Sequence, residues 1–275
     1  MLGGAQHFQT ECSESKGAKM KNVSRWRPTK FVKRRGRLAA SRNASEVNPS
    51  SRLMVDLVAA CYQRHLSAHC RGRLVDLGCG KVPLFGAYRD LVSDVTCVDW
   101  QNSLHKGDHI DCLCDLSKPL PFESESFDTA IVSDVLEHLP EPTVMWSEMA
   151  RILRPAGKCF VNVPFFYWLH EHPHDYCRYT EFALRRFAQS VGLKVVVFEA
   201  IGGSPEVFAD MFAKHAARIP VLGGPTALLA QSMASAFVRL RIGRRVSEQS
   251  AAYYPFGYFM ICQRADSPLC ERSGD

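Results

Sequence analysis

Short apolar runs alternate with helix-like stretches along most of this chain, and that alternation limits its fold more than any other feature. Apolar runs bounded by turn signals indicate buried strands, and strands separated by helices indicate a parallel sheet covered on both faces. The clearest helices between them are 142–153 and 180–191. The sequence therefore predicts an α/β fold with a doubly wound, mostly parallel, seven-stranded sheet. The expected strands are 74–77, 95–98, 110–114, 129–132, 159–163, 195–198 and 258–262.

The length of 275 residues suits one large domain. We expect it to span 50–264, beginning with a helix capped by Ser50 or Ser51 and ending with the last strand, before a tail at 265–275. A helical insert is expected at about 202–253, between the sixth strand and the last. Within it, residues 219–238 carry no charge and are followed by Arg239, Arg241, Arg244 and Arg245.

The positive charge is concentrated at the N-terminus. The net charge is +6, and residues 1–45 hold eleven Lys or Arg against two acids. Little hydrophobic periodicity accompanies this charge, so residues 1–49 are predicted to be a disordered basic arm that the domain does not need for folding. The eleven cysteines lack the spacing of a disulfide framework and no apolar run follows Met1, so a cytoplasmic location is expected.

Three successive predicted strands each end in an acid, and the first also ends in a glycine turn. Asp76 precedes Gly78 and Gly80, Asp99 ends the second strand, and Asp115 ends the third. In open α/β sheets ligands bind beyond the carboxyl ends of the strands, and glycines let the backbone approach a ligand closely. An acid at the end of the second strand can accept hydrogen bonds from a ribose diol. These residues predict a nucleoside-binding site.

In their order, these motifs resemble the class I S-adenosylmethionine-dependent methyltransferases. Asp76-Leu77-Gly78-Cys79-Gly80 is similar to the first motif of that family, and the segments 120–122 and 126–128 are similar to the approach to its fourth strand. Residues 135–139 and 151–157 complete the order, so the resemblance covers roughly 70–200. It implies S-adenosylmethionine as the cofactor. A dinucleotide fold would instead need a third glycine where Pro83 stands.

The resemblance also implies which residues hold the cofactor. Gly78 and Gly80 would lie against its methionine part, Asp99 would bind the ribose hydroxyls, and Asp115 would reach the adenine amine. The other expected members of the cofactor site are Asp76, Cys79, Trp100, Leu116 and Ser133.

The acceptor side is expected in the loop 164–180, which is dense in aromatic and ionisable residues. A hydroxyl acceptor must lose a proton, and a histidine suits that task, so His138, His174 and Asp175 are the candidate catalytic residues. His170, Tyr176, Arg178 and Tyr179 are the candidate acceptor-binding residues. Although His170, His172 and His174 alternate, Pro173 bends the run, and no metal site is expected.

The predicted activity is methyl transfer, at oxygen, to a small-molecule, glycan or lipid-linked acceptor. The loop resembles bacterial methyltransferases found near surface-glycan and lipid-linked sugar genes, in its residues 173–180. The charge-free insert and the arginines after it predict a peripheral membrane contact through 219–245. The alternative is a non-catalytic module of the same fold, whose basic arm contacts nucleic acid or a membrane. A nucleic-acid partner is not expected for the enzyme, and the oligomeric state stays open.

Overall fold

A seven-stranded sheet forms the centre of the molecule, with strand order β5-β4-β3-β6-β7-β9-β8. The computed structural model describes residues 18–103 and 107–266. Strands β5, β4, β3, β6 and β7 pair in parallel, and β9 pairs antiparallel with both β7 and β8. The strands are β3 (Gly72–Leu77), β4 (Val92–Asp99), β5 (Cys112–Leu113), β6 (Phe127–Ser133), β7 (Leu153–Pro164), β8 (Leu193–Ile201) and β9 (Gly257–Arg264). The predicted doubly wound, mostly parallel sheet is confirmed.

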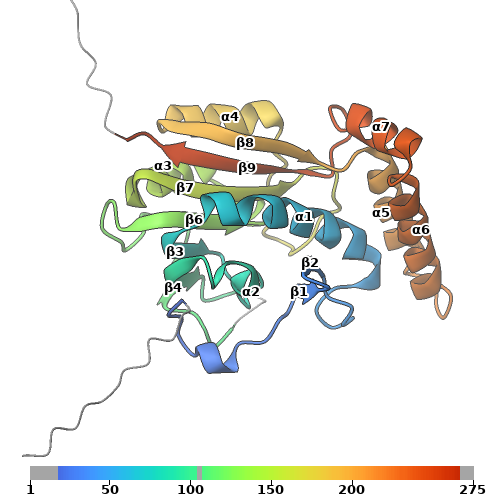
Figure 1. Ribbon diagram of the computed structural model, residues 1–275, viewed down its shortest axis with the longest axis horizontal. Coiled ribbons are helices and arrows are strands. Elements are labelled where there is room, and N and C mark those ends of the chain that lie inside the picture. The colour runs from blue at the N-terminus through green and yellow to red at the C-terminus, as the bar shows by residue number, and fades with distance from the viewer. Residues whose placement is uncertain (1–17, 104–106, 267–275) are drawn as a thin grey trace, which may run out of the picture.

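Helices cover both faces of this sheet, as Figure 1 shows. One apolar cluster joins the sheet to α1 (Arg52–His69) and α2 (Phe85–Tyr88). The other joins the opposite face to α3 (Pro142–Ile152) and α4 (Glu181–Ser190). The switch point of the sheet lies between β3 and β6, because the chain winds from β3 toward β5 in one direction and from β6 toward β8 in the other.

Local capping explains where two of the helices begin. The Thr180 hydroxyl accepts a hydrogen bond from the Ala183 N–H at 3.2 Å, which satisfies a free donor in the first turn of α4. Of the two serines expected to cap α1, Ser50 and Ser51, Ser51 stands at the N-cap position but makes no side-chain capping hydrogen bond. Both serines belong to a 3-10 turn, η2 (Pro49–Ser51), and Asn48 caps that turn by accepting from the Ser50 N–H at 3.0 Å.

The N-terminal segment, residues 18–49, packs on the domain, so the predicted disordered arm is wrong for these residues. It forms a 3-10 turn, η1 (Val23–Arg25), and a hairpin of β1 (Phe31–Arg34) and β2 (Arg37–Ala40). The turn residues Arg35 and Gly36 both have positive φ, as in the tight hairpin turns that match strand twist. Residues 1–17 of the predicted arm lie outside the described residues.

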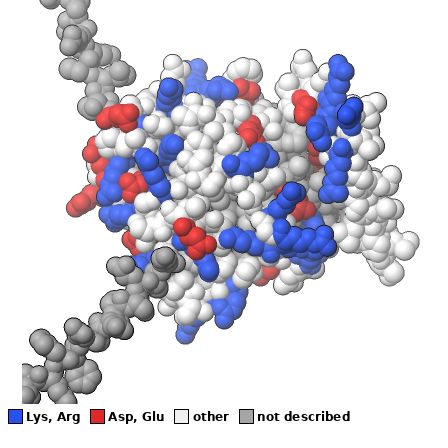
Figure 2. All heavy atoms as spheres, viewed as in Figure 1, with Lys and Arg blue, Asp and Glu red and all other residues white. Residues whose placement is uncertain are grey.

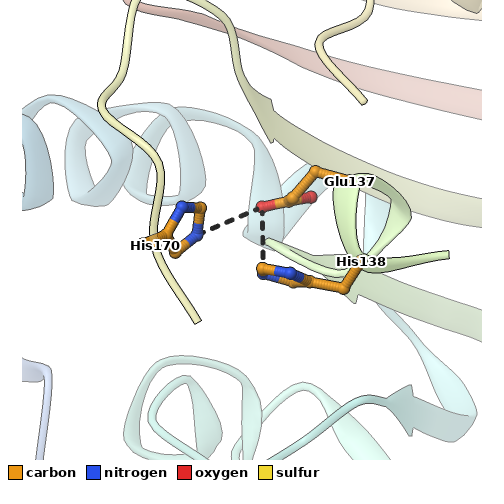
Figure 3. A group of neighbouring side chains, drawn as sticks. All are labelled: Glu137, His138 and His170. Carbon is orange, nitrogen blue, oxygen red and sulfur yellow. Dashed lines mark ion pairs between the residues drawn. The ribbon is translucent and has the colours of Figure 1, made fainter. Parts of the chain in front are cut away.

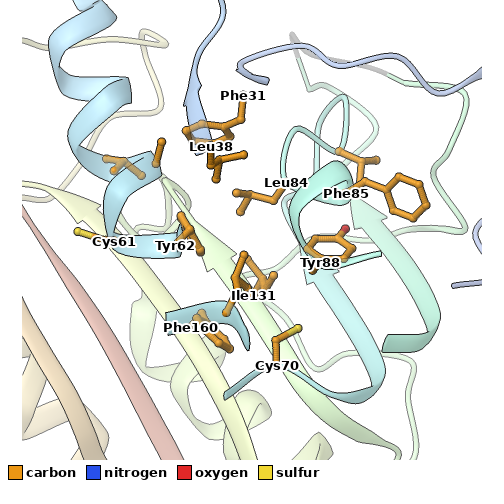
Figure 4. Close-up of a cluster of buried hydrophobic side chains, with 14 of the residues drawn as sticks. Phe31, Leu38, Cys61, Tyr62, Cys70, Leu84, Phe85, Tyr88, Ile131 and Phe160 are labelled. Carbon is orange, nitrogen blue, oxygen red and sulfur yellow. The ribbon is translucent and has the colours of Figure 1, made fainter. Parts of the chain in front are cut away.

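Only a few apolar side chains attach the N-terminal segment to the rest of the domain. Figure 4 shows Phe31 and Leu38 beside Tyr62 of α1 and Leu84, and both are buried. The Trp26 ring lies 5.2 Å from that of Phe85, and its Nε1–H donates to the Val82 carbonyl at 3.0 Å. Side chains of α1 also accept hydrogen bonds from backbone N–H groups of β2. A few buried apolar side chains, together with hydrogen-bonded backbone N–H groups, are enough to hold this segment against the domain although it lacks hydrophobic periodicity.

The helical insert lies between β8 and β9, where the sequence places it, and it has three helices rather than the two expected. They are α5 (Ser204–Ala216), α6 (Gly223–Phe237) and α7 (Arg241–Ser250). Figure 1 shows them grouped at one end of the sheet. We call residues 204–250 the insert. No helix in the described part of the chain is long and apolar enough to cross a membrane.

Candidate active site

The glycine turn after β3 has a backbone that only glycine adopts easily. Gly78 has φ +72°, Gly80 has φ +51°, and a Cβ on Gly78 would lie 2.4 Å from a methyl carbon of Val135. Asp99, buried at the end of β4, accepts from the Gly80 N–H and the Trp100 N–H, each at 2.8 Å. The turn and the end of β4 are thus joined by a charged acceptor, which holds the ends of the two strands in register.

A cleft of about 310 Å³ opens beside this turn at the carboxyl ends of β3 and β6. Gly78, Cys79, Gly80 and Ser133 line one side. The opposite side comes from α1, from the loop after β7 and from the N-terminal segment, including Lys30 and residues 45–48. Lys81 Nζ lies 3.2 Å from both carboxylate oxygens of Glu46 and so links the turn to that segment. The N-terminal segment is therefore part of the candidate site.

Asp76 lies beneath the cleft in a buried position on β3. Burial raises its pKa to about 7, although the Tyr88 hydroxyl donates a hydrogen bond to it at 2.9 Å and thereby favours the ionised form. Tyr88 belongs to α2, whose Phe85 contacts Trp26. The N-terminal segment therefore covers the helix that shields this carboxyl group.

Comparison with known proteins finds relatives of this part of the chain. A family model described as "Methyltransferase domain" matches residues 75–161. The ubiquinone biosynthesis O-methyltransferase of Xanthomonas euvesicatoria is 32% identical over 100 residues, covering 33% of this chain and 42% of that protein. The chain thus matches less than half the length of this curated relative. A putative methyltransferase structure from Bacillus halodurans has a TM-score of 0.50 at 12% identity, covering 76% of this chain and 99% of that one. This structural likeness supports the doubly wound α/β fold. Residues 75–161 of this chain therefore resemble a methyltransferase domain.

The cofactor residues that the resemblance implies fall into two groups in the structure. Gly78, Cys79, Gly80 and Ser133 line the cleft, with Asp99 at its edge. The second group lies on the other side of β4. Asp115 accepts from the Ser117 N–H at 2.9 Å, and Leu116 is buried in the core. The ribose and adenine contacts of Asp99 and Asp115 stay predictions.

The acceptor-side loop is organised around Asp175 and Arg178, which lie together. The Arg178 guanidinium makes a two-pronged pair with the Asp175 carboxylate and also donates to the Trp168 carbonyl. Arg178 holds the pKa of Asp175 well below its usual range despite the desolvation that opposes this. An acid held ionised in this way is a poor proton acceptor, so the geometry favours a positioning role for Asp175 rather than a catalytic one. Arg178 is likewise engaged within the loop.

The remaining candidates of the loop divide between core and surface. Tyr179 is buried, and its hydroxyl donates to the Leu136 carbonyl at 2.8 Å, which suits a structural role. Tyr176 is half exposed, and its hydroxyl lies 3.2 Å from His174 Nδ1. The His174 ring packs edge-on against Trp100 at 5.1 Å. Because Trp100 follows Asp99, His174 lies at the junction of the expected cofactor and acceptor sides.

His138 and His170 come together around Glu137, a residue that the sequence analysis does not single out. Glu137 and His138 belong to η3 (Leu136–His138), and His170 comes from the loop after β7 (Figure 3). Glu137 Oε1 lies 3.8 Å from His138 Nε2 and 4.0 Å from His170 Nε2. His172 is exposed and His174 packs on Trp100, so neither joins this cluster. The signal in the sequence was the adjacent Glu-His pair just after a strand.

Lys30 and Asp134 are a second pair that the sequence analysis does not identify. Lys30 Nζ lies 2.6 Å from Asp134 Oδ2, and the Asn162 amide donates to Asp134 Oδ1 at 2.6 Å. Burial lowers the pKa of Lys30, but the neighbouring Asp134 carboxylate outweighs it, so the net shift is upward. Both residues line the cleft. Because Lys30 belongs to the segment predicted to be disordered, no pattern in the sequence could place it here.

Proposed function

We propose that the protein transfers the methyl group of S-adenosylmethionine to an oxygen of its acceptor. The observation that carries the proposal is the glycine turn fixed by Asp99 at the floor of the cleft, where the cofactor's methionine part would lie. The relatives named for O-methylation, from Xanthomonas and from Idiomarina loihiensis (31% identical over 100 residues, 41% of its length), support oxygen as the target.

The acceptor would lie near the ends of β6 and β7, where His138 and His170 meet and His174 lies beside Trp100. Methyl transfer from a sulfonium is an in-line displacement, so the main demand is to hold the attacking oxygen about 3 Å from the methyl carbon. A hydroxyl also has to lose its proton, and the imidazoles of this region suit that step. Attack forms the O–C bond, breaks the C–S bond and leaves S-adenosylhomocysteine.

Cofactor binding tests the first part of this proposal. Asp99→Ala removes the charged acceptor that holds the glycine turn and is expected to reach the ribose. A hydrogen bond to a charged group is worth about 1.5–3 kcal/mol, so affinity for S-adenosylmethionine should fall roughly ten- to a hundred-fold by calorimetry. Asp90→Ala, which removes an exposed acid elsewhere, is the matched control. Unchanged affinity in Asp99→Ala would rule out this cofactor site.

Product formation tests the second part and separates the enzyme from a non-catalytic module. Purified protein is incubated with methyl-labelled S-adenosylmethionine and pools of phenols, sugars and lipid-linked sugars. The proposal expects a labelled methyl ether and S-adenosylhomocysteine in equal amounts. Tight cofactor binding with no transfer to any pool would favour the module instead.

For the acceptor class we propose a glycan or lipid-linked molecule met at a membrane surface. The insert supports this because its exposed side chains include Phe208, Phe212, Leu229 and Met233. Figure 2 shows Lys and Arg gathered over α7 beside a largely uncharged surface over α6. Apolar burial and attraction between arginine and anionic lipid add at an interface, at about 1 kcal/mol per charge.

Vesicle flotation tests the membrane contact. Wild-type protein should float with vesicles containing anionic lipid at low salt, and a variant with Arg239, Arg241, Arg244 and Arg245 changed to Ser should not. Neutral vesicles provide the control for charge. Wild-type protein that stays in the soluble fraction would exclude the membrane contact without affecting the proposed chemistry.

A further inference from the structure

Glu137 is a buried carboxylate without a hydrogen-bond donor among the described residues. Its side chain has no exposed surface, and neither oxygen has a hydrogen-bond partner. Its own backbone N–H is near enough to favour the charged form but does not meet the geometry of a hydrogen bond. A buried acid left in this state is costly unless it binds a proton or a cation. Something that is not part of the chain is therefore expected at this position.

The charged groups around Glu137 already have other partners. Lys30 is paired with Asp134, and Arg178 is paired with Asp175. Neither cation forms an ion pair with Glu137, although both act on it at longer range. The carboxylate thus faces two imidazoles and no bound cation from the described chain.

Both imidazoles present an unprotonated nitrogen to Glu137 when they are neutral. A carbonyl can only accept, so His138 Nδ1 carries the proton that it donates to the His174 carbonyl at 2.6 Å. That leaves the lone pair of neutral His138 on Nε2, which faces Glu137. His170 Nδ1 lies 3.2 Å from Asp175 Oδ2, a charge contact that favours the proton on Nδ1 and the lone pair on Nε2. Three lone-pair donors converging on one point repel each other unless a proton or a metal cation lies between them.

The spacing of the three ligand atoms suits a metal ion. Oε1 of Glu137 and the two Nε2 atoms all lie within 4.8 Å of one another. Metal bonds of about 2.0–2.2 Å place tetrahedral ligand atoms roughly 3.4 Å apart. Side-chain rotations that move each ligand atom by about 1 Å would therefore bring the three atoms to bonding distance of one ion. Ligating histidines commonly donate their other ring N–H to a carbonyl or carboxylate, as His138 Nδ1 does here, and Asp175 Oδ2 lies 3.2 Å from His170 Nδ1 without hydrogen-bond geometry.

We propose that Glu137, His138 and His170 bind a divalent transition-metal ion of the zinc type. Two imidazoles and one carboxylate favour ions such as Zn²⁺ or Co²⁺ over Mg²⁺ and Ca²⁺, which prefer oxygen ligands. Three protein ligands leave a position open, as in catalytic zinc sites. This differs from the expectation from the sequence, which weighed the run His170, His172 and His174 and expected no metal.

The role of the ion rests on the proposed function. At the open position the ion would bind the acceptor hydroxyl and make its oxygen easier to deprotonate, as it does for bound water. The proton would leave to solvent, and the oxygen would then attack the methyl carbon of the cofactor. His138 would then act as a ligand rather than as the base.

The test uses full-length protein without a histidine tag, stripped with a chelator and titrated with Co²⁺ in the absence of cofactor and acceptor. The proposal expects one ion per chain and the visible absorption of tetrahedral or five-coordinate Co²⁺, which Zn²⁺ removes. Glu137→Gln and His170→Ala should each weaken binding at least ten-fold. His172→Ala, on the same loop but exposed, should bind as the wild type does.

Several outcomes would overturn the site. The proposal fails if stripped wild-type protein binds less than one ion, or if Glu137→Gln and His170→Ala leave the Co²⁺ spectrum unchanged. His170→Asn serves as a second variant if His170→Ala does not fold by circular dichroism. Ion binding without any methyl transfer would contradict the proposed function and leave the site intact. Full transfer activity in the stripped enzyme would reject the role of the ion in the reaction.

Discussion

The N-terminal segment and the insert differ in which side chains they bury. The segment is rich in Lys and Arg, yet it buries Met20, Phe31 and Leu38 and leaves its charges exposed or paired. The insert holds the charge-free stretch 219–238, yet it buries Glu206, Asp210, Lys214 and Gln231 while exposing Phe, Leu and Met. Composition suggested a free arm, and the buried side chains of residues 18–49 contradict it. Burial depends on which surface a side chain meets, and composition alone does not specify that surface.

The polar groups of the insert attach it to the domain. The Gln231 amide accepts from the Leu53 N–H at 2.8 Å and donates to the Pro49 carbonyl at 3.0 Å, which satisfies the start of α1. Lys214 pairs with Asp210, and its Nζ lies 4.1 Å from the centre of the Tyr167 ring. Val207 and Ala213 of α5 are buried, but several large apolar side chains of the insert are exposed. They are available for a partner in a way that those of the N-terminal segment are not.

The largest expected effect separates two phenylalanines. Phe31 is 3% exposed and Phe208 is 65% exposed. Phe31→Ala should lower the free energy of unfolding by about 3–5 kcal/mol, as for other buried phenylalanines. Phe208→Ala should change it by no more than about 0.5 kcal/mol. Urea unfolding of both variants measures the difference. A loss in Phe31→Ala as small as that expected for Phe208→Ala would show that the segment is not packed as described.

A pH effect of intermediate size comes from Asp76, beneath the helix that the N-terminal segment covers. Its pKa of about 7 lies above the unfolded value, so the folded state binds the extra proton between about pH 4 and 7. Asp76 therefore makes stability fall as pH rises through that window, by about 1.4 kcal/mol per pKa unit at most. Asp76→Asn should flatten the decline in Tm between pH 4 and 7. Glu137, whose pKa is also raised by burial, contributes in the same direction and leaves a residual slope.

A smaller effect is expected where the insert meets α1. Gln231→Leu leaves the Leu53 N–H and the Pro49 carbonyl without their partners, and an unsatisfied buried group costs about 1–3 kcal/mol. Thermal unfolding should show a loss in that range. Gln231→Glu, which keeps the acceptor but loses the donor, is the control for the Leu53 bond. No loss in Gln231→Leu would indicate that water replaces both bonds.

The smallest effect on stability is expected on the outer surface of α6. Leu229 and Met233 are each more than 60% exposed. Changing both to Ser should alter the free energy of unfolding by about 0.5 kcal/mol or less. The same variant should float less well with anionic vesicles if this face meets lipid. A large loss of stability would show that these side chains are covered by part of the chain or by a second copy.

The sequence by itself determined the sheet, the order of its motifs and the glycine turn. All seven predicted strands are present, because strands of a sheet covered on both faces are rich in apolar residues, and this leaves a visible pattern. Gly78 and Gly80 were identifiable for a similar reason, since the positive φ values of this turn restrict the residue type.

Only the tertiary structure decided how segments distant in the chain meet. Lys30 reaches Asp134 across 104 positions, and His170 meets Glu137 through a loop that no periodicity describes. The same loop brings Asp175 against Arg178, while its expected catalytic role stays a prediction. Each of these contacts joins one polar side chain to one other. Such contacts depend on three-dimensional proximity, for which a linear pattern of apolar and polar residues has no period.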